Sequence, residues 1–200
     1  MVEVDAKTVM ALRKQTGAPM MDCKAALQET GGDMEKAGDV LRKKGLQSAD
    51  KKADRDAAEG LVFTYVHPPG RLGVMVAVAC ETDFVARNEE FLQFGKDLCL
   101  HIAFSNPLGL NKDDIPEDAV AKERKLLTEQ AEEQMAGKPD DVVQKAIDGR
   151  MAKFYSERCL MEQPWVKDDK QSVEEVRKAL VGKIGENIQI TRFARFELGS

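Results

Sequence analysis

The chain has 200 residues, of which 42% are apolar and 32% are charged, and its formal net charge is −5. This composition is typical of a soluble globular protein and excludes a chain that is disordered throughout. It also excludes a helical membrane protein, because no apolar run approaches the roughly 18 residues that a spanning helix needs. The net acidity disfavours nucleic-acid binding. The first residues lack the basic and then apolar pattern of a secretory signal, so we expect a cytoplasmic protein.

Three short helices with glycine turns are predicted in the first fifty residues, because apolar residues recur there at helical spacing. The helices begin near Asp5, Pro19 and Asp33, and they end at Gly17, Gly31 and Gly45. Three such helices make a compact module that is only marginally stable alone. We therefore expect it to be stabilised by contact with a partner or to serve as a docking head. We assign residues 1–54 to this module and its linker, and residues 55–200 to a second domain.

Strand spacing replaces helical spacing after residue 60. Over residues 61–66 two sets of side chains alternate, one with Leu61, Phe63 and Tyr65 and the other with Val62, Thr64 and Val66. Leu72–Ala79 place β-branched residues on one face and small residues on the other. Pro68-Pro69-Gly70 provides the turn between the two strands, so we predict a β-hairpin. Both faces of this hairpin are fairly apolar. We therefore expect both to be covered, one of them by another chain.

Helices and a final strand are predicted over the remainder of the chain. Four segments with helical patterns lie near residues 88–105, 116–135, 143–160 and 172–185. The first begins after Asn88, a fair N-cap, and its stripe contains Phe91, Leu98 and Ile102. Residues 188–198 are rich in β-forming residues and could add a strand to the hairpin. The fold class is therefore α+β, with a three-helix module and an antiparallel hairpin or three-stranded sheet packed with helices.

The cysteines and histidines give no sign of a catalytic or metal site. The four cysteines are far apart and form no C-x-x-C pair, which excludes a zinc knuckle or a dithiol motif; they are Cys23, Cys80, Cys99 and Cys159. We expect all four to be reduced and packed as small apolar groups. The only histidines are His67 and His101, and His101 beside an apolar stripe is better explained as a hydrogen-bonded core residue. We therefore expect no cofactor, no metal and no enzymatic activity.

The segment Thr82-Asp83-Phe84-Val85 is the most informative loop. It lies at a predicted junction between strand and helix, where loops on rigid elements commonly carry function. It also places a carboxylate beside a large aromatic ring. From spacing alone, the simplest interpretation is structural: Asp83 caps the next helix and Phe84 joins the core.

Five blocks of sequence, in order along nearly the whole chain, favour a functional interpretation. They are LRKQTGAPMMDCKAAL (12–27), ADRDAAEG (53–60), ETDFVARN (81–88), EQPWVKDD (162–169), and IGENI with RFARF (184–188 and 192–196). Together these blocks resemble the elongation factor Ts family. Proline at position 19 and tryptophan at position 165 depart from the residues usual in that family, and both fit their expected local structure.

The resemblance implies a function and a set of contact residues. Members of this family release nucleotide from the GTPase elongation factor Tu, and they do so without being enzymes. By this resemblance Asp83 and Phe84, in the loop Thr82–Val85, would insert near the nucleotide pocket of the partner and disturb its magnesium and phosphate site. Met20 and Met21 lie in the signature turn of the N-terminal module, which resembles a ubiquitin-associated-type fold and would touch the GTPase domain. Short members of the family also suggest a homodimer, in which a second copy supplies a second half-core.

Two other functions remain as alternatives to nucleotide exchange. One is an enzyme in which a histidine pairs with Cys80 or Glu81, although no nucleophile elbow, phosphate loop or metal signature is present. The other is a plain binding module, in which the three-helix head recognises some protein and the rest of the chain only dimerises. Acceleration of GDP release from elongation factor Tu would distinguish exchange from binding alone.

Overall fold

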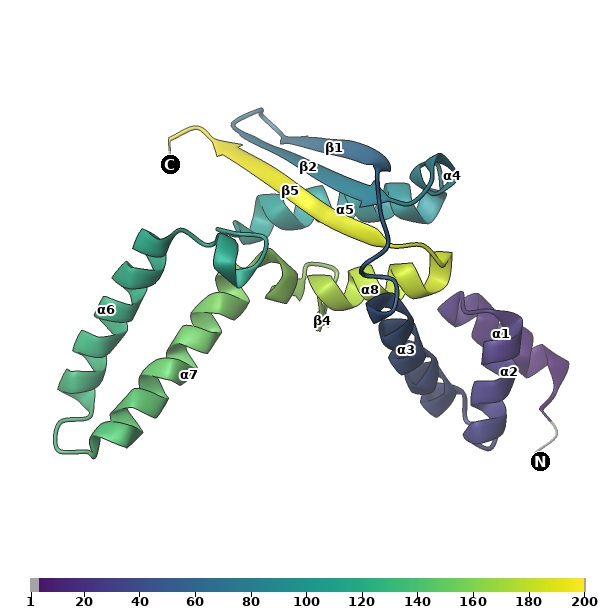
Figure 1. The fold of residues 1–200 in the computed structure, drawn as a ribbon, viewed down its shortest axis with the longest axis horizontal. Helices are drawn as coiled ribbons and strands as arrows, with labels where there is room; N and C mark the ends of the chain where they lie inside the picture. Colours follow the sequence, from purple (N-terminus) through teal and green to yellow (C-terminus); the bar gives the residue numbers. More distant parts are fainter. Residues whose placement is uncertain (1–3, 200) are drawn as a thin grey trace. The chain divides into compact units, whose positions relative to one another are not determined.

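The computed structural model describes residues 4–199 (Figure 1). The helices of this range are α1 (Ala6–Thr16), α2 (Met20–Glu29), α3 (Met34–Asp50), α4 (Asp83–Ala86), α5 (Glu89–Ser105), α6 (Glu117–Gln134), α7 (Asp140–Arg158) and α8 (Val173–Ile184), with 3-10 turns at Lys112–Asp114 and Leu160–Glu162. The strands are β1 (Glu59–His67), β2 (Leu72–Cys80), β3 (Pro164–Trp165), β4 (Asp168–Ser172) and β5 (Ile188–Glu197). The predicted α+β class is confirmed. No helix in the described range is long and apolar enough to cross a membrane.

The chain divides into two compact units. The first combines the chain up to Leu61 with Val78–Gln93 and Glu175–Gln189, and the second combines Val62–Ala77, Phe94–Glu174 and the chain from Ile190 onward. The first unit thus contains α1, α2 and α3 together with α4 and most of α8. The second contains most of the sheet together with α6 and α7. The domain boundary expected after residue 54 stays a prediction.

A small apolar core holds the three N-terminal helices together, as helical spacing predicts. Leu12, Leu27 and Ala37 contribute one fully buried side chain from each helix. Asp33 caps α3 as expected, because its carboxylate accepts hydrogen bonds of 3.1 Å from two backbone amides of the first turn. One position differs from the expected pattern: Met10, which spacing places on the inner side of α1, is 62% exposed.

The predicted end of the third helix at Gly45 is wrong. Helix α3 continues through this glycine to Asp50. The close approach requires the glycine of the other helix: a Cβ on Gly182 of α8 would lie only 2.8 Å from the Cα of Gly45, whereas a Cβ on Gly45 would meet nothing within 4 Å. The last turn of α3 is also held by an ion pair of 2.7 Å between Asp50 and Lys178. Contacts with α8, a distant part of the sequence, accompany the continuation of the helix and make Gly45 a site of close approach.

The final strand joins the hairpin, as predicted. The sheet has the order β1-β2-β5, so β5 lies along β2 (Figure 1). The backbone N–H of Leu198 donates to the carbonyl of Arg71 at 2.9 Å, and the hydroxyl of Thr191 donates to the carbonyl of Ala77 at 3.2 Å. Residue numbers therefore increase along β5 while the numbers of the facing residues of β2 decrease, which makes the pair antiparallel.

One face of the hairpin is buried against helix α5. The predicted valine face is covered, since Val74, Val76 and Val78 are at most 2% exposed. A Cβ on Gly95 of α5 would lie 2.3 Å from the ring of Phe63, so the glycine lets this ring approach the helix closely. The predicted stripe of α5 is confirmed as well, because Phe91, Leu98 and Ile102 have no exposed surface and Gly95 is buried between them.

Helices α6 and α7 lie side by side and share a core of their own (Figure 1). This core contains Leu127 and Ala131 from α6 and Ile147 and Met151 from α7. These two residues lie in the helical segment predicted near residues 143–160, and Val143 and Phe154, which share their helical spacing, are partly buried beside them.

The cysteines are unpaired and buried, as the sequence predicts. Burial raises the pKa of Cys99 to about 11. Burial is also the main cause that raises the pKa of Cys80 and of Cys159. These thiols therefore stay protonated near neutral pH and behave as packed apolar groups rather than nucleophiles.

His101 is a buried, hydrogen-bonded core residue, as expected. Its Nδ1 accepts the backbone N–H of Val166 at 3.3 Å, and its Nε2 lies 2.9 Å from Oε1 of Gln163. Because a backbone N–H can only donate, the proton of the neutral ring lies on Nε2 and points at Gln163. The amide nitrogen of Gln163 donates in turn to two backbone carbonyls. The ring of His101 also stacks on Trp165 at 5.2 Å between centroids, and burial lowers its pKa below the ordinary value.

We expect acid to destabilise the protein through His101. An unfolded histidine takes up a proton near pH 6.5, whereas the buried ring binds it only at lower pH, so the unfolded state binds more protons in this window. The contribution of His101 to the free energy of unfolding should be complete above about pH 6.5. At lower pH the free energy of unfolding should decrease by up to about 1.4 kcal/mol per pH unit. Denaturant unfolding followed by the fluorescence of Trp165, the only tryptophan of the chain, measures this.

Matched histidine variants assign the effect. His101→Gln should flatten the profile between pH 6.5 and 5.5, and His67→Gln, a change at an exposed position of the hairpin, is the matched control. A wild-type profile without slope in this window would contradict the expectation.

Candidate functional site

The loop Thr82–Val85 holds its aromatic ring out into solvent. Thr82 is the N-cap of α4, and its hydroxyl accepts the backbone N–H of Val85 at 3.4 Å. Val85 is buried and anchors the turn, whereas Phe84 is 80% exposed. The purely structural interpretation of this segment is therefore wrong on both counts: Thr82 rather than Asp83 is the cap, and Phe84 lies outside the core.

Asp83 presents its carboxylate at the same surface. One of its oxygens pairs with the guanidinium of Arg87 at 2.8 Å, one helical turn further on, and its side chain is 49% exposed. An ion pair this exposed contributes little to stability, because water screens it. The carboxylate can therefore exchange its arginine for another positive or hydrogen-bonding group at little cost. The loop thus offers an acid and a ring side by side.

A turn distant in sequence holds the base of this loop. The backbone N–H and the hydroxyl of Thr82 donate to the two carboxylate oxygens of Glu186, at 3.1 and 2.8 Å. In the opposite direction, the backbone N–H of Asn187 donates to Oε1 of Glu81 at 2.6 Å. The side-chain amide of Asn187 donates to the carbonyls of residues 53 and 55, which fixes this turn as well. Sequence reasoning did not assign a role to Glu186 or Asn187, although both lie in a block that carries the family resemblance.

The thiol of Cys80 adds a hydrogen bond to the first residue of the loop. It donates to the carbonyl oxygen of Thr82 at 3.2 Å. Burial raises the pKa of this thiol, and the negative charge of Glu186 raises it further. The sulfur therefore remains a hydrogen-bond donor near neutral pH, and the backbone at Thr82 is held through its N–H and its carbonyl alike.

Met20 and Met21 begin helix α2 and are exposed, by 41% and 73%. The turn before them passes through Gly17, whose φ of +69° favours glycine. The side chain of Lys183 lies over this glycine, so that a Cβ there would be 2.0 Å from the lysine Cε. The same lysine pairs with Glu90 at 2.6 Å. Both predicted contact sets thus belong to the first unit, and both are supported by the end of α8 or the turn after it.

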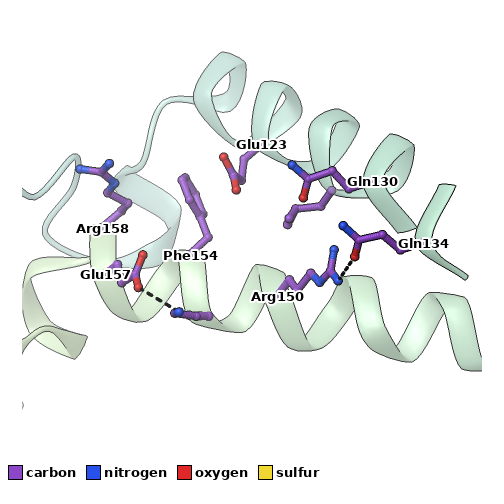
Figure 2. Close-up of a pocket in the computed structure, with 9 residues that line it drawn as sticks. Glu123, Gln130, Gln134, Arg150, Phe154, Glu157 and Arg158 are labelled. Carbon is purple, nitrogen blue, oxygen red and sulfur yellow. Dashed lines mark hydrogen bonds and ion pairs between the residues drawn. The ribbon is translucent and has the colours of Figure 1, made fainter. Parts of the chain in front are cut away.

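A pocket of about 450 Å³ lies between α6 and α7 (Figure 2). Its walls mix apolar and oppositely charged side chains, and several of these satisfy one another, as Arg150 does with Gln134 at 2.8 Å and Lys153 with Glu157 at 3.7 Å. Within residues 4–199, no group of three or more histidine, cysteine, aspartate or glutamate side chains is placed to hold a metal ion. Because polar side chains of this pocket pair with one another, the exposed loop is the stronger candidate site.

Comparison with known proteins gives a consistent result. Residues 48–200 match the sequence profile of a family described as Elongation factor TS. The elongation factor Ts of Anaeromyxobacter sp. (strain K) is 53% identical over 199 residues, which cover 100% of this chain and 90% of the relative. That of Solidesulfovibrio magneticus is 50% identical over 199 residues, covering 100% and 98%. That of Caldanaerobacter subterraneus subsp. tengcongensis is 50% identical over 196 residues, covering 98% and 97%.

Proposed function

Because this chain belongs to the elongation factor Ts family, we propose that it is a guanine-nucleotide exchange factor that binds elongation factor Tu and promotes the release of GDP. Membership of this family makes it a translation elongation factor. The observation that carries the finer proposal is the exposed ring of Phe84, 80% accessible beside Asp83 on a loop whose base is hydrogen-bonded on both sides. A large apolar ring held in water by a fixed scaffold is typical of a contact residue that a partner buries.

The proposed mechanism acts on the metal site of the partner. Mg²⁺ requires near-ideal octahedral geometry and bridges the nucleotide phosphates to the GTPase. A ring that enters beside this site has only to shift the surrounding backbone slightly to spoil that geometry. Asp83 would stabilise the displaced groups of the partner. Without its metal the diphosphate charge is poorly compensated, and GDP leaves faster.

Thermodynamic linkage makes the effect reciprocal. The factor weakens GDP binding by the same free energy as GDP weakens binding of the factor. An incoming nucleotide therefore expels the factor, and the cycle needs no covalent chemistry and no cofactor in this chain. Met20 and Met21 would add contact area on the GTPase domain, since both are exposed at the start of α2. The site of action is the cytoplasm, where translation takes place.

A homodimer is part of the proposal. Val62 and Val66 of β1 and Met75 of β2 are 58%, 64% and 49% exposed. Apolar side chains that remain exposed on a sheet are candidates for burial by a second copy. Light scattering after size-exclusion chromatography should give twice the chain mass of 22.2 kDa; a mass of one chain at micromolar concentration would remove the dimer from the proposal.

A nucleotide-release assay tests the exchange function. Elongation factor Tu is loaded with labelled GDP and chased with excess unlabelled GDP, with and without the protein. We expect the release rate to rise with protein concentration and then to saturate. Binding without acceleration would favour the plain binding module over exchange, and the absence of both binding and acceleration would overturn the proposal altogether.

A further inference from the structure

We propose that Glu186 is a positioning residue for nucleotide exchange, whose carboxylate fixes the loop Thr82–Val85 in the geometry that presents Phe84. This inference rests on the proposed function, and it assigns a role to a side chain outside the loop itself. It follows from three features of the first unit: the pair of hydrogen bonds from Thr82, the cap that Thr82 makes to α4, and the reciprocal bond from the turn to Glu81.

The first feature is the match between donors and acceptors. Thr82 offers two donors, its backbone N–H and its hydroxyl, and each meets a different oxygen of Glu186. A carboxylate accepts at both oxygens and has no donor of its own, and bonds to a charged acceptor are the stronger kind. An amide in its place would turn one N–H₂ group toward a donor. Because both oxygens face Thr82, Glu186 acts through this residue.

The second feature is a relay from Glu186 to the helix that carries the ring. The Thr82 hydroxyl gives its hydrogen to Glu186, which leaves an oxygen lone pair free to accept the backbone N–H of Val85. Helix α4 spans only Asp83–Ala86. A single turn cannot sustain itself, because the nucleation of a helix is unfavourable. The cap at Thr82, oriented by Glu186, therefore decides whether Phe84 is held at a fixed angle.

The third feature is that the bonds run in both directions. Glu186 accepts from Thr82, while Glu81 accepts from the backbone of Asn187 at 2.6 Å. The adjacent residues Glu81 and Thr82 are thus bonded to the adjacent residues Glu186 and Asn187. A shift of one segment by one residue relative to the other would break all of these hydrogen bonds. Gly185, with φ of +92°, sets the direction in which the chain enters this turn. A loop fixed in advance loses less conformational entropy when it inserts into a partner.

Glu186→Gln tests the proposal in the nucleotide-release assay. We expect the maximal stimulated rate of GDP release to fall about tenfold. The concentration that gives half of this rate should change by less than about twofold, since the other contacts with the GDP-bound partner remain. Glu162→Gln is the matched control: it removes a carboxylate that is also half-buried and that pairs with Lys112 in the second unit, and it should retain the wild-type rate.

A double-mutant cycle separates positioning from a general loss of stability. In a Phe84→Ala background, Glu186→Gln should lower the rate no further, because the ring through which it acts is already absent. Additive losses from the two changes would overturn the proposal. Thr82→Val, which removes the hydroxyl from the other side of the same bond, should reproduce the lower maximal rate even if Glu186→Gln folds poorly; a wild-type rate for this folded variant would also overturn it.

Hydrogen exchange of the free protein gives a readout that does not depend on the partner. The backbone amide hydrogens of Val85 and Ala86 should exchange with solvent faster in Glu186→Gln than in the wild type. Unchanged rates of hydrogen exchange at these amides would refute the positioning role. If the wild-type protein fails to accelerate GDP release, the proposed function fails while this measurement still decides whether Glu186 orders the loop. If the wild type is active and both readouts of Glu186→Gln match it, only the inference fails.

Discussion

Phe84→Ala is expected to lower the maximal stimulated rate of GDP release from elongation factor Tu by about tenfold or more, with little change in the thermal midpoint. The ring is 80% exposed in the free chain, so its removal takes away almost no packing within this protein. Any large effect must therefore arise in the complex with the partner. Truncation to alanine of an aromatic residue buried at the centre of an interface costs about 2 kcal/mol or more of binding free energy, which corresponds to roughly a thirtyfold change in the equilibrium constant.

A matched control uses another exposed phenylalanine. Phe104 of α5 is 81% exposed, lies in the second unit and carries the same ring. Phe104→Ala should leave GDP release unchanged, which shows that the effect belongs to the loop and not to exposed aromatic surface in general. Full exchange activity in a folded Phe84→Ala variant would rule out the ring as the displacing group, whatever the affinity of the complex.

Gly60→Ala is expected to be the most destabilising of the glycine substitutions in the hairpin. Gly60 has φ of +139°, a conformation that other residues rarely adopt. A Cβ there would lie 2.2 Å from the carbonyl oxygen of Val78 and 2.7 Å from the Cα of Ala79. Both neighbours are backbone atoms of the paired strand, so neither can rotate away. We expect a loss of about 3 kcal/mol or more, and a thermal midpoint lower by roughly 6–12 °C.

Two other hairpin glycines separate the causes of this loss. Gly70→Ala should cost about 1–2 kcal/mol from backbone strain alone, because its φ is +100° but nothing lies within 4 Å of the added carbon. Gly73→Ala should be close to neutral, since its nearest neighbour would be at 4.0 Å and its φ is ordinary. Thermal or denaturant unfolding of the three variants measures the order. A Gly60 variant as stable as the Gly70 variant would show that the strands can separate to admit a side chain.

Local chemistry of the sequence is enough to determine most elements of this fold. The cap at Asp33, the alternating valines of β2 and the apolar stripe of α5 each depend on residues within one or two turns or along one strand, and all three are confirmed. The loop Thr82–Val85 is predicted as the candidate site only through the family resemblance, because spacing alone favours a structural role for Asp83 and Phe84. Five ordered blocks add the family and, with it, the expected partner.

Only the tertiary structure decides how that site is built. Thr82 and Asp83 are both good caps by type, and the two donors of Thr82 find their acceptor in Glu186, 104 positions away along the chain. Gly45 ends a helix by local rules, yet α3 continues through it beside Gly182. In each case the deciding contact joins segments far apart in sequence. Periodicity and capping describe neighbours along the chain, so they carry no information about which distant acceptor or glycine will meet them.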